Sequence, residues 1–154
     1  MFRRPGSQAK ILVAVLALII ASPLVLSCGS GDDHGDAGDA ESHPIQNQAI
    51  LQYDFLSDMD QDPYYPQNQV EKGEAILLRL CAAIERDKPV APDDVYALTH
   101  AATIEFNGLA REFMDQGSEI ETVARENIAA DLAFVLSTYG YDLDIEEAIA
   151  PRDW

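Results

Sequence analysis

Apolar residues recur every three to four positions through most of the chain after residue 66, which is the period of helices that bury one face. The first such stretch covers residues 67–87, and Pro89 ends it because proline cannot continue a helix. Asn68 and Glu71 form a candidate capping pair near its start. Its expected buried face consists of Val70, Gly73, Leu77, Leu80 and Ile84.

A second helix is predicted over residues 92–115. Pro92 suits the first turn, and the acidic pair Asp93 and Asp94 favours the positive end of a helix. Gly117 is well placed to end this helix, because glycine adopts positive φ without strain. Its expected buried face consists of Val95, Leu98, Ala102, Leu109 and Phe113, with Phe106 nearby.

A third helix is predicted over residues 119–139. The tetrapeptide Ser118-Glu119-Ile120-Glu121 resembles a capping box, in which the serine and the second glutamate satisfy each other's backbone amides. Gly140 follows the last predicted turn. The expected buried stripe consists of Ala124, Ile128, Leu132, Val135, Leu136 and Tyr139.

Two shorter helices complete the pattern. One covers about residues 145–150, with Asp144 as its cap and Pro151 at its end, and the other covers about residues 45–55. No run alternates apolar and polar residues as a half-buried strand does. We therefore predict an all-α domain over residues 45–154, a small antiparallel bundle of three long helices plus one or two short ones.

The stretch SDMDQDPYYP precedes the first long helix and spaces Asp58, Asp60 and Asp62 like the first ligands of a calcium loop. Such a loop needs glycine at its sixth position and a bidentate glutamate at its twelfth. This chain has Pro63 and Gln69 there. We favour a proline-stiffened turn in which Tyr64 and Tyr65 cover the core, and keep weak calcium binding as the alternative.

The N-terminal residues 1–27 have the order of an export signal. MFRRPGSQAK is basic, ILVAVLALII is apolar, and small residues follow before Cys28. Val25-Leu26-Ser27-Cys28 resembles the lipobox of bacterial lipoproteins, in which acyl groups such as palmitate are attached to the cysteine. The resemblance implies lipidation at Cys28 and anchoring to a membrane of the bacterial cell envelope. An uncleaved anchor helix is the alternative.

Residues 28–44 are predicted to be the lipidated cysteine followed by a disordered acidic tether. Residues 29–44 have no large apolar side chain, so they cannot bury enough surface to fold. His34 and His43 lie among acidic residues there, and a loose metal site is the less favoured interpretation.

The whole chain has 10 basic and 27 acidic residues and a net charge of −17. Because such a chain repels phosphate backbones, we expect no nucleic-acid partner. Anionic lipid headgroups are repelled as well, so membrane attachment should come from an anchor rather than from a basic patch.

No catalytic motif stands out, and nothing in the sequence predicts a cofactor or a structural metal. The candidates for chemistry are His100, Glu126 and Arg125, which an inter-helix pocket could bring together. We favour structural roles: His100 at the core edge on a backbone carbonyl or a carboxylate, and Arg125 paired with Glu121 four residues earlier. An anion-recognising Arg125 in a groove between helices is the sharper alternative. Cys81 lies on the first helix and is expected to be buried and inert.

Four short segments resemble a small bacterial family of uncharacterised helical proteins: Tyr53-Asp54-Phe55-Leu56, Asp62-Pro63-Tyr64-Tyr65-Pro66, Gly117 to Thr122, and Arg152-Asp153-Trp154. The resemblance implies a single helical domain and brings no activity. The only tryptophan, Trp154, is expected to dock on the bundle, with use in an interface as the alternative.

Together these features predict a membrane-anchored lipoprotein that carries a helical binding or interaction domain. The expected partner of this domain is a protein of the cell envelope. An enzyme or accessory subunit is the alternative.

Overall fold

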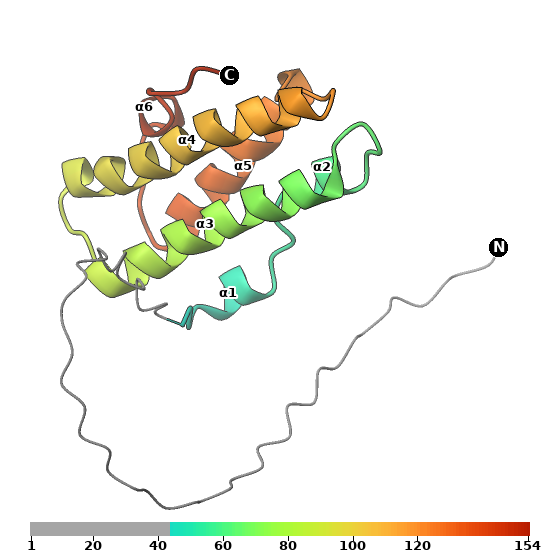
Figure 1. The fold of residues 1–154 in the computed structure, drawn as a ribbon. Coiled ribbons are helices and arrows are strands. Elements are labelled where there is room, and N and C mark those ends of the chain that lie inside the picture. Colours follow the sequence, from blue (N-terminus) through green and yellow to red (C-terminus); the bar gives the residue numbers. More distant parts are fainter. Residues whose placement is uncertain (1–43) are drawn as a thin grey trace, which may run out of the picture. The chain divides into compact units, whose positions relative to one another are not determined.

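The computed structural model describes residues 44–154, and these residues form six helices and no strand. The all-α prediction is therefore confirmed for this part of the chain (Figure 1). The helices are α1 (Gln48–Leu51), α2 (Ser57–Asp60), α3 (Gln67–Asp87), α4 (Pro92–Asp115), α5 (Thr122–Thr138) and α6 (Ile145–Ala148).

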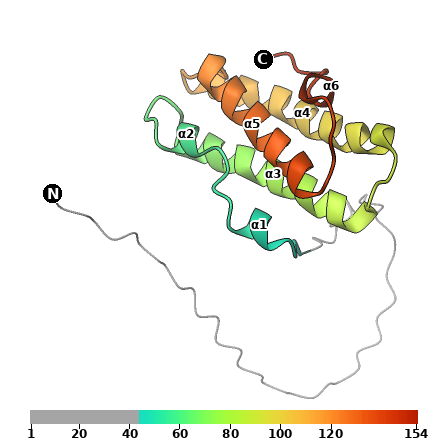
Figure 2. The same cartoon turned by 180° about the vertical axis from the view of Figure 1, so that it is seen from behind.

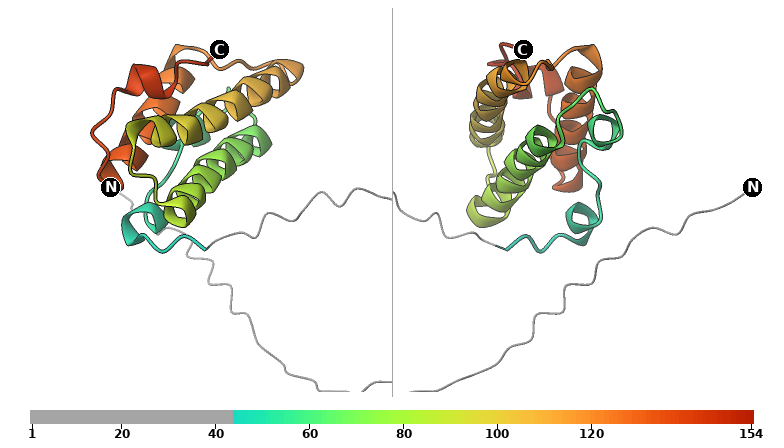
Figure 3. Two further views of the ribbon diagram at one scale, coloured as in Figure 1. Left: turned by 90° about the vertical axis from the view of Figure 1, so that its left-hand side faces the viewer. Right: turned by 45° about the vertical axis from the view of Figure 1, so that its right-hand side comes forward.

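The three long helices enclose the core. α3 and α4 lie side by side and run in opposite directions, and α5 packs behind them, as the reversed view shows (Figures 1 and 2). The short helices α1 and α2 contact α5, and α6 lies against α4 and α5 (Figure 3). The bundle is thus closed on two sides by segments that are too short to be stable alone.

The predicted bounds of the first two long helices agree with α3 and α4. The predicted capping pair of Asn68 and Glu71 is wrong, because the cap residue of α3 is Pro66. The Pro66 carbonyl accepts from the amides of Gln69 and Val70, at 2.8 and 3.2 Å, so Asn68 already lies inside the first turn.

The predicted capping box of the third helix is also wrong, since α5 begins at Thr122 with Glu121 as its cap residue and no side-chain cap. Ser118 belongs instead to the end of α4. Its amide donates to the Phe113 carbonyl at 3.0 Å, and Gly117, at a φ of 78°, donates to Met114 at 3.0 Å. This Schellman arrangement needs Ser118 one residue beyond the glycine, which is incompatible with starting a helix there.

The short helices differ more from the expectation. The helix predicted over residues 45–55 is only the single turn α1, capped by Asn47, whose Oδ1 accepts from the Ala49 amide at 2.9 Å. The single turn α2 was not predicted. Asp144 caps α6 as expected, accepting from the Glu146 amide at 2.9 Å.

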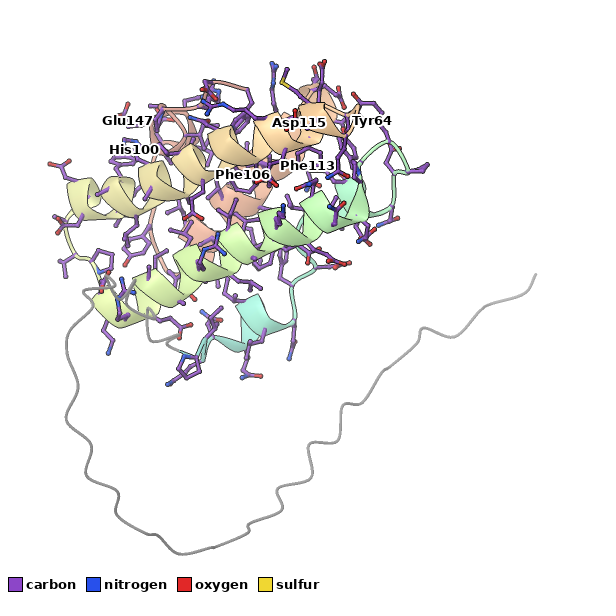
Figure 4. All side chains as sticks on the ribbon, viewed as in Figure 1. Tyr64, His100, Phe106, Phe113, Asp115 and Glu147 are labelled. Carbon is purple, nitrogen blue, oxygen red and sulfur yellow. The ribbon has the colours of Figure 1, made fainter. Side chains whose placement is uncertain are left out.

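The core follows the predicted stripes, and aromatic side chains such as Phe106 and Phe113 fill the space between the helices (Figure 4). All predicted core positions of α3 are buried, whereas Leu98 of α4 and Tyr139 beyond α5 are half-buried. Position 73 requires glycine for steric reasons, because an added Cβ would lie 2.6 Å from Leu56 Cδ1. Cys81 is fully buried, as predicted, and burial raises the pKa of its thiol to about 12.

A buried carboxylate on α5 was not foreseen from the sequence. Asp131 is 1% exposed and accepts from the Leu56 amide at 2.7 Å and from the Tyr53 hydroxyl at 2.9 Å. Leu56 has a φ of 51°, so this bond holds a strained residue at the start of α2. Burial raises the pKa of Asp131, and the two hydrogen bonds lower it only in part. Asp131 thereby fastens the segment before α3 to the bundle.

No helix within residues 44–154 is long and apolar enough to cross a membrane. The predicted signal segment, Cys28, His34 and His43 lie outside the described residues.

A candidate binding groove beside Trp154

A groove of about 480 Å³ lies where α4, the α4–α5 connection, the first turn of α5 and the last residues of the chain meet. α4 contributes Asn107 and Arg111 among others, α5 contributes Arg125, and the chain end contributes Asp153 and Trp154. The groove therefore joins segments that are distant in sequence.

The chain end is fixed along α4 by both groups of the Asn107 amide. Its Nδ2 donates to the Pro151 carbonyl at 2.9 Å, and its Oδ1 accepts from the Asp153 amide at 3.1 Å. The Trp154 ring meets Phe106 edge to face, with centroids 6.4 Å apart and planes at 67°. The predicted docking of Trp154 on the bundle is confirmed, and its position is set by hydrogen bonds as well as by packing.

Two arginines of this groove form no ion pair. Four of the seven lysine and arginine side chains of residues 44–154 are paired: Lys72 with Glu112, Arg79 with Glu105, Arg86 with Asp87 and Arg152 with Glu146. Lys88, which lies outside this groove, is the other basic side chain of these residues without an ion pair. Arg111 and Arg125, both exposed, form no ion pair with any described residue.

The predicted ion pair between Glu121 and Arg125 does not form. Glu121 instead accepts from the Tyr65 hydroxyl at 2.5 Å, and this bond is the main reason that the pKa of Glu121 is lowered. Tyr65 is buried at 4% exposure and approaches from the segment before α3. The positive charge of Arg125 still contributes to lowering the pKa of Glu121, but the guanidinium forms no ion pair with it and lines the groove.

The indole N–H of Trp154, a residue that lines the groove, is an unsatisfied buried donor. Its Nε1 is buried and has no acceptor within residues 44–154. A buried donor without a partner costs about 1–3 kcal/mol, so a ligand that supplied an acceptor would recover stability. Arg111, Arg125 and Trp154 thus all line one groove.

The remaining lining is apolar or acidic. Ile120 is buried and Met114 is 63% exposed, so the groove has an apolar surface open to solvent. The exposed side chains of Glu119 and Asp153 also line the groove, and neither is paired with an arginine in this part of the chain.

The other proposed chemical residues lie apart from one another. His100 Nε2 is 2.7 Å from the Glu147 carbonyl oxygen, where α4 meets α6 (Figure 4). A bond to a backbone carbonyl is one of the two partners that the sequence interpretation expected for His100. Glu126 is exposed on α5, and within residues 44–154 no hydrogen bond or ion pair joins His100, Glu126 and Arg125. His100 precedes Asn107 of the groove by seven residues, about 10 Å along the helix axis.

The alternating aspartates have separate structural roles. Asp58 and Asp60 lie on α2, and Asp60 accepts from the Gln67 amide group across the turn. Asp62 accepts from the Tyr64 amide at 2.9 Å, closing a local turn. No group of three metal-binding side chains occurs within the described residues. Of the two tyrosines expected to cover the core, only Tyr65 does, because Tyr64 is 45% exposed (Figure 4).

A second groove of about 480 Å³ lies at the far end of α3, beside Glu85, Lys88 and Tyr139. There Glu85 accepts from the amides of Gln46 and Asn47, at 2.7 and 3.0 Å, and from the Tyr139 hydroxyl at 2.8 Å. The Glu85 carboxylate holds the residues that precede α1. The acidic group of this groove therefore has a structural role, which the charged groups of the groove beside Trp154 lack.

Comparison with known proteins places most of the chain in one family. The family model described as "Family of unknown function (DUF5713)" matches residues 49–154. The match covers more than half of the 154 residues, so the chain belongs to this family. No curated protein and no solved structure matches the chain. The expected resemblance to a family of uncharacterised domains is confirmed, and the family description adds no activity.

Proposed function

We propose that this member of the family is a membrane-anchored lipoprotein whose helical domain is a binding module, and that its ligand enters the groove beside Trp154. The observation that carries the proposal is the gathering around one groove of two exposed arginines without an ion pair among the described residues, Arg111 and Arg125, and of Trp154, whose buried indole N–H has no acceptor there. A buried donor without an acceptor, such as the Trp154 indole N–H, is costly in a native fold unless a ligand supplies the acceptor.

Binding explains the groove better than catalysis does. Of the side chains that act as covalent nucleophiles, the lining contains only the carboxylates of Glu119 and Asp153, and it contains no histidine, lysine or tyrosine to serve beside them as an acid or base. His100, the residue that sequence alone offered as a base, is bonded to a backbone carbonyl outside the groove. An apolar surface with a few convergent polar groups is typical of ligand sites.

The anchor part of the proposal rests on the order of residues 1–28. A basic start, an apolar run and small residues before Cys28 fit a lipoprotein signal. Several acyl chains, with each buried CH₂ worth about 0.8 kcal/mol, would hold the protein stably on a membrane of the envelope. Residues 29–44 would then separate the domain from the bilayer surface.

The anchor is tested by Triton X-114 partitioning and labelled-palmitate incorporation of the full chain, compared with Cys28→Ala. Cys81→Ala is the matched control, because it removes the other cysteine, which is buried in the domain. We expect wild type and Cys81→Ala to enter the detergent phase with label and Cys28→Ala to do neither. Equal retention of label by Cys28→Ala would end the lipoprotein assignment.

The binding module is tested by photo-crosslinking in native envelopes, with the probe at Met114 on the rim of the groove. We expect crosslinked adducts in wild type that disappear in the double variant Arg111→Gln/Arg125→Gln. Arg79→Gln is the control, since Arg79 is an exposed arginine paired with Glu105 away from this groove. Adducts of equal yield in all three proteins would contradict a role for the groove.

A further inference from the structure

The groove beside Trp154 contains charges of both signs that are not paired with each other. Arg111 and Arg125 contribute two positive charges, and Glu119 and Asp153 contribute two negative ones. We propose, building on the binding function above, that the ligand is a zwitterion with an apolar body, namely an amino acid or a short peptide with free ends.

The carboxylate of such a ligand would meet the donors of the groove. A guanidinium offers a planar fork that matches the two oxygens of a carboxylate, and neither arginine forms an ion pair among the described residues. The Trp154 side chain lines the same space, and its buried Nε1–H has no acceptor in this part of the chain. The two guanidinium groups alone carry enough donors for one carboxylate, whose two oxygens accept up to about four bonds.

The ammonium group of the ligand would meet the carboxylates. Glu119 lies in the α4–α5 connection, and Asp153 is held in place because its backbone amide donates to Asn107 at 3.1 Å. These two acidic groups disfavour a purely anionic ligand such as phosphate, because like charges across a small site repel. The same two groups attract an ammonium, so the charge pattern selects for a ligand that carries both charges.

The apolar part of the lining and the size of the groove limit the body of the ligand. Ile120, at 5% exposure, and Met114, at 63%, offer surface to an aliphatic side chain. A volume of about 480 Å³ lies within the range of small-molecule sites and accommodates an amino acid or a very short peptide. A folded partner could insert only a terminus into it.

Isothermal titration calorimetry of the full chain in detergent micelles tests the ligand class. The probes are leucyl-leucine, free leucine, N-acetyl-leucyl-leucine without the ammonium, leucyl-leucine amide without the carboxylate, and inorganic phosphate. We expect saturable binding of leucyl-leucine or leucine and binding at least about tenfold weaker for both blocked dipeptides, because each loses a charge-assisted contact. Whichever zwitterion binds more tightly distinguishes a peptide site from an amino-acid site.

Variants tie this selectivity to the groove. Arg125→Gln and Arg111→Gln should each weaken leucyl-leucine about tenfold or more, and Glu119→Gln should abolish the preference over the N-acetyl form. Arg79→Gln and Glu126→Gln, exposed and outside the lining, should change neither. If phosphate or N-acetyl-leucyl-leucine binds as tightly as leucyl-leucine, the zwitterion inference is overturned while the groove remains a binding site. If no probe gives heat, the inference is likewise overturned, and crosslinking at Met114 still decides the binding function independently.

Discussion

Replacing Asp131 with alanine should loosen the segment that precedes α3. The Asp131 carboxylate is 1% exposed and holds the Leu56 amide at 2.7 Å and the Tyr53 hydroxyl at 2.9 Å. Leu56 is fully buried, so alanine at position 131 leaves its amide without an acceptor or water. Tyr53 is half-buried, and its hydroxyl can turn toward solvent.

The magnitude follows from these two bonds. An unsatisfied buried donor costs about 1–3 kcal/mol, and the loss of a partly exposed hydrogen bond adds about 0.5–1.5 kcal/mol. Removing a buried charge offsets part of this sum, because burial penalises the ionised carboxylate. We therefore expect Asp131→Ala to lower the free energy of unfolding by about 1–4 kcal/mol at pH 7. Asp131→Asn keeps one acceptor oxygen and should lose about half as much or less.

Urea unfolding followed by circular dichroism provides the measurement, with Tyr53→Phe as the control. Phenylalanine keeps the stacking on Phe134, at 3.7 Å between ring centroids, and removes only the hydroxyl. Its cost should be about 0.5–1.5 kcal/mol. If Asp131→Ala unfolds within about 0.5 kcal/mol of wild type, the proposed fastening by Asp131 is refuted.

The same residue predicts a pH dependence of stability. The folded-state pKa of Asp131 is raised above the ordinary aspartate value of about 3.9, mainly by burial. The stability contributed by this group is fully present below the ordinary pKa and is lost as pH rises through the raised one. The stability advantage of wild type over Asp131→Asn should therefore shrink between about pH 4 and neutral pH. If the advantage instead grew with pH, the fold would favour the ionised carboxylate of Asp131, and the raised pKa would be wrong.

Three further results are expected. Gly117→Ala should lower the thermal midpoint by the equivalent of about 1 kcal/mol, because φ is 78° at this position. Gly108→Ala should raise the midpoint, because alanine favours the helix and nothing lies within 4 Å of its new Cβ in α4. Equal shifts of the midpoint in the two variants would refute this argument. In the Cys28→Ala background, Cys81 should resist iodoacetamide at pH 8 until urea unfolds the chain, because its pKa is about 12; rapid native labelling would be inconsistent with its burial. Millimolar calcium should leave the thermal midpoint unchanged, because Asp60 and Asp62 already accept hydrogen bonds from Gln67 and Tyr64. A rise in the midpoint that Asp58→Asn abolishes would restore the calcium interpretation.

Helix periodicity predicted the bounds of α3 and α4 because each has an uninterrupted apolar face and a clear proline or glycine at its end. It misplaced the start of α5 because Ser118 is suited to two roles, as a cap for the next helix and as the last residue of the preceding Schellman motif. The motif at Gly117 prevails there, and no local signal in the sequence distinguishes the two.

The polar positions of the core were harder to foresee than the apolar ones. Asn127 and Asp131 are buried on α5, whereas the sequence pattern alone predicts that a polar residue of a helix is exposed. Their roles depend on the Leu56 and Met59 amides, which lie about seventy residues earlier in the chain. Only the fold shows that these amides need acceptors.

The candidate site was predicted in part. Arg125 stood out because it adjoins the apolar stripe of its helix, but its expected pairing with Glu121 is replaced by a hydrogen bond from Tyr65. Arg111 gave no sequence signal, because an arginine on an amphipathic helix is ordinary. Its proximity to Trp154 arises from the return of the chain end along α4, which Asn107 fixes. Such long-range convergence is not encoded in any local pattern.

The resonance of the Trp154 indole N–H tests the binding groove most directly, since this is the only tryptophan of the chain and its donor is unsatisfied among the described residues. In ¹H–¹⁵N spectra of the full chain, we predict that leucyl-leucine shifts the indole proton downfield with saturation. The shift should be absent in Arg111→Gln/Arg125→Gln and retained in Arg79→Gln. An indole resonance that leucyl-leucine leaves unmoved in wild type, or moves equally in the double arginine variant, would contradict the account.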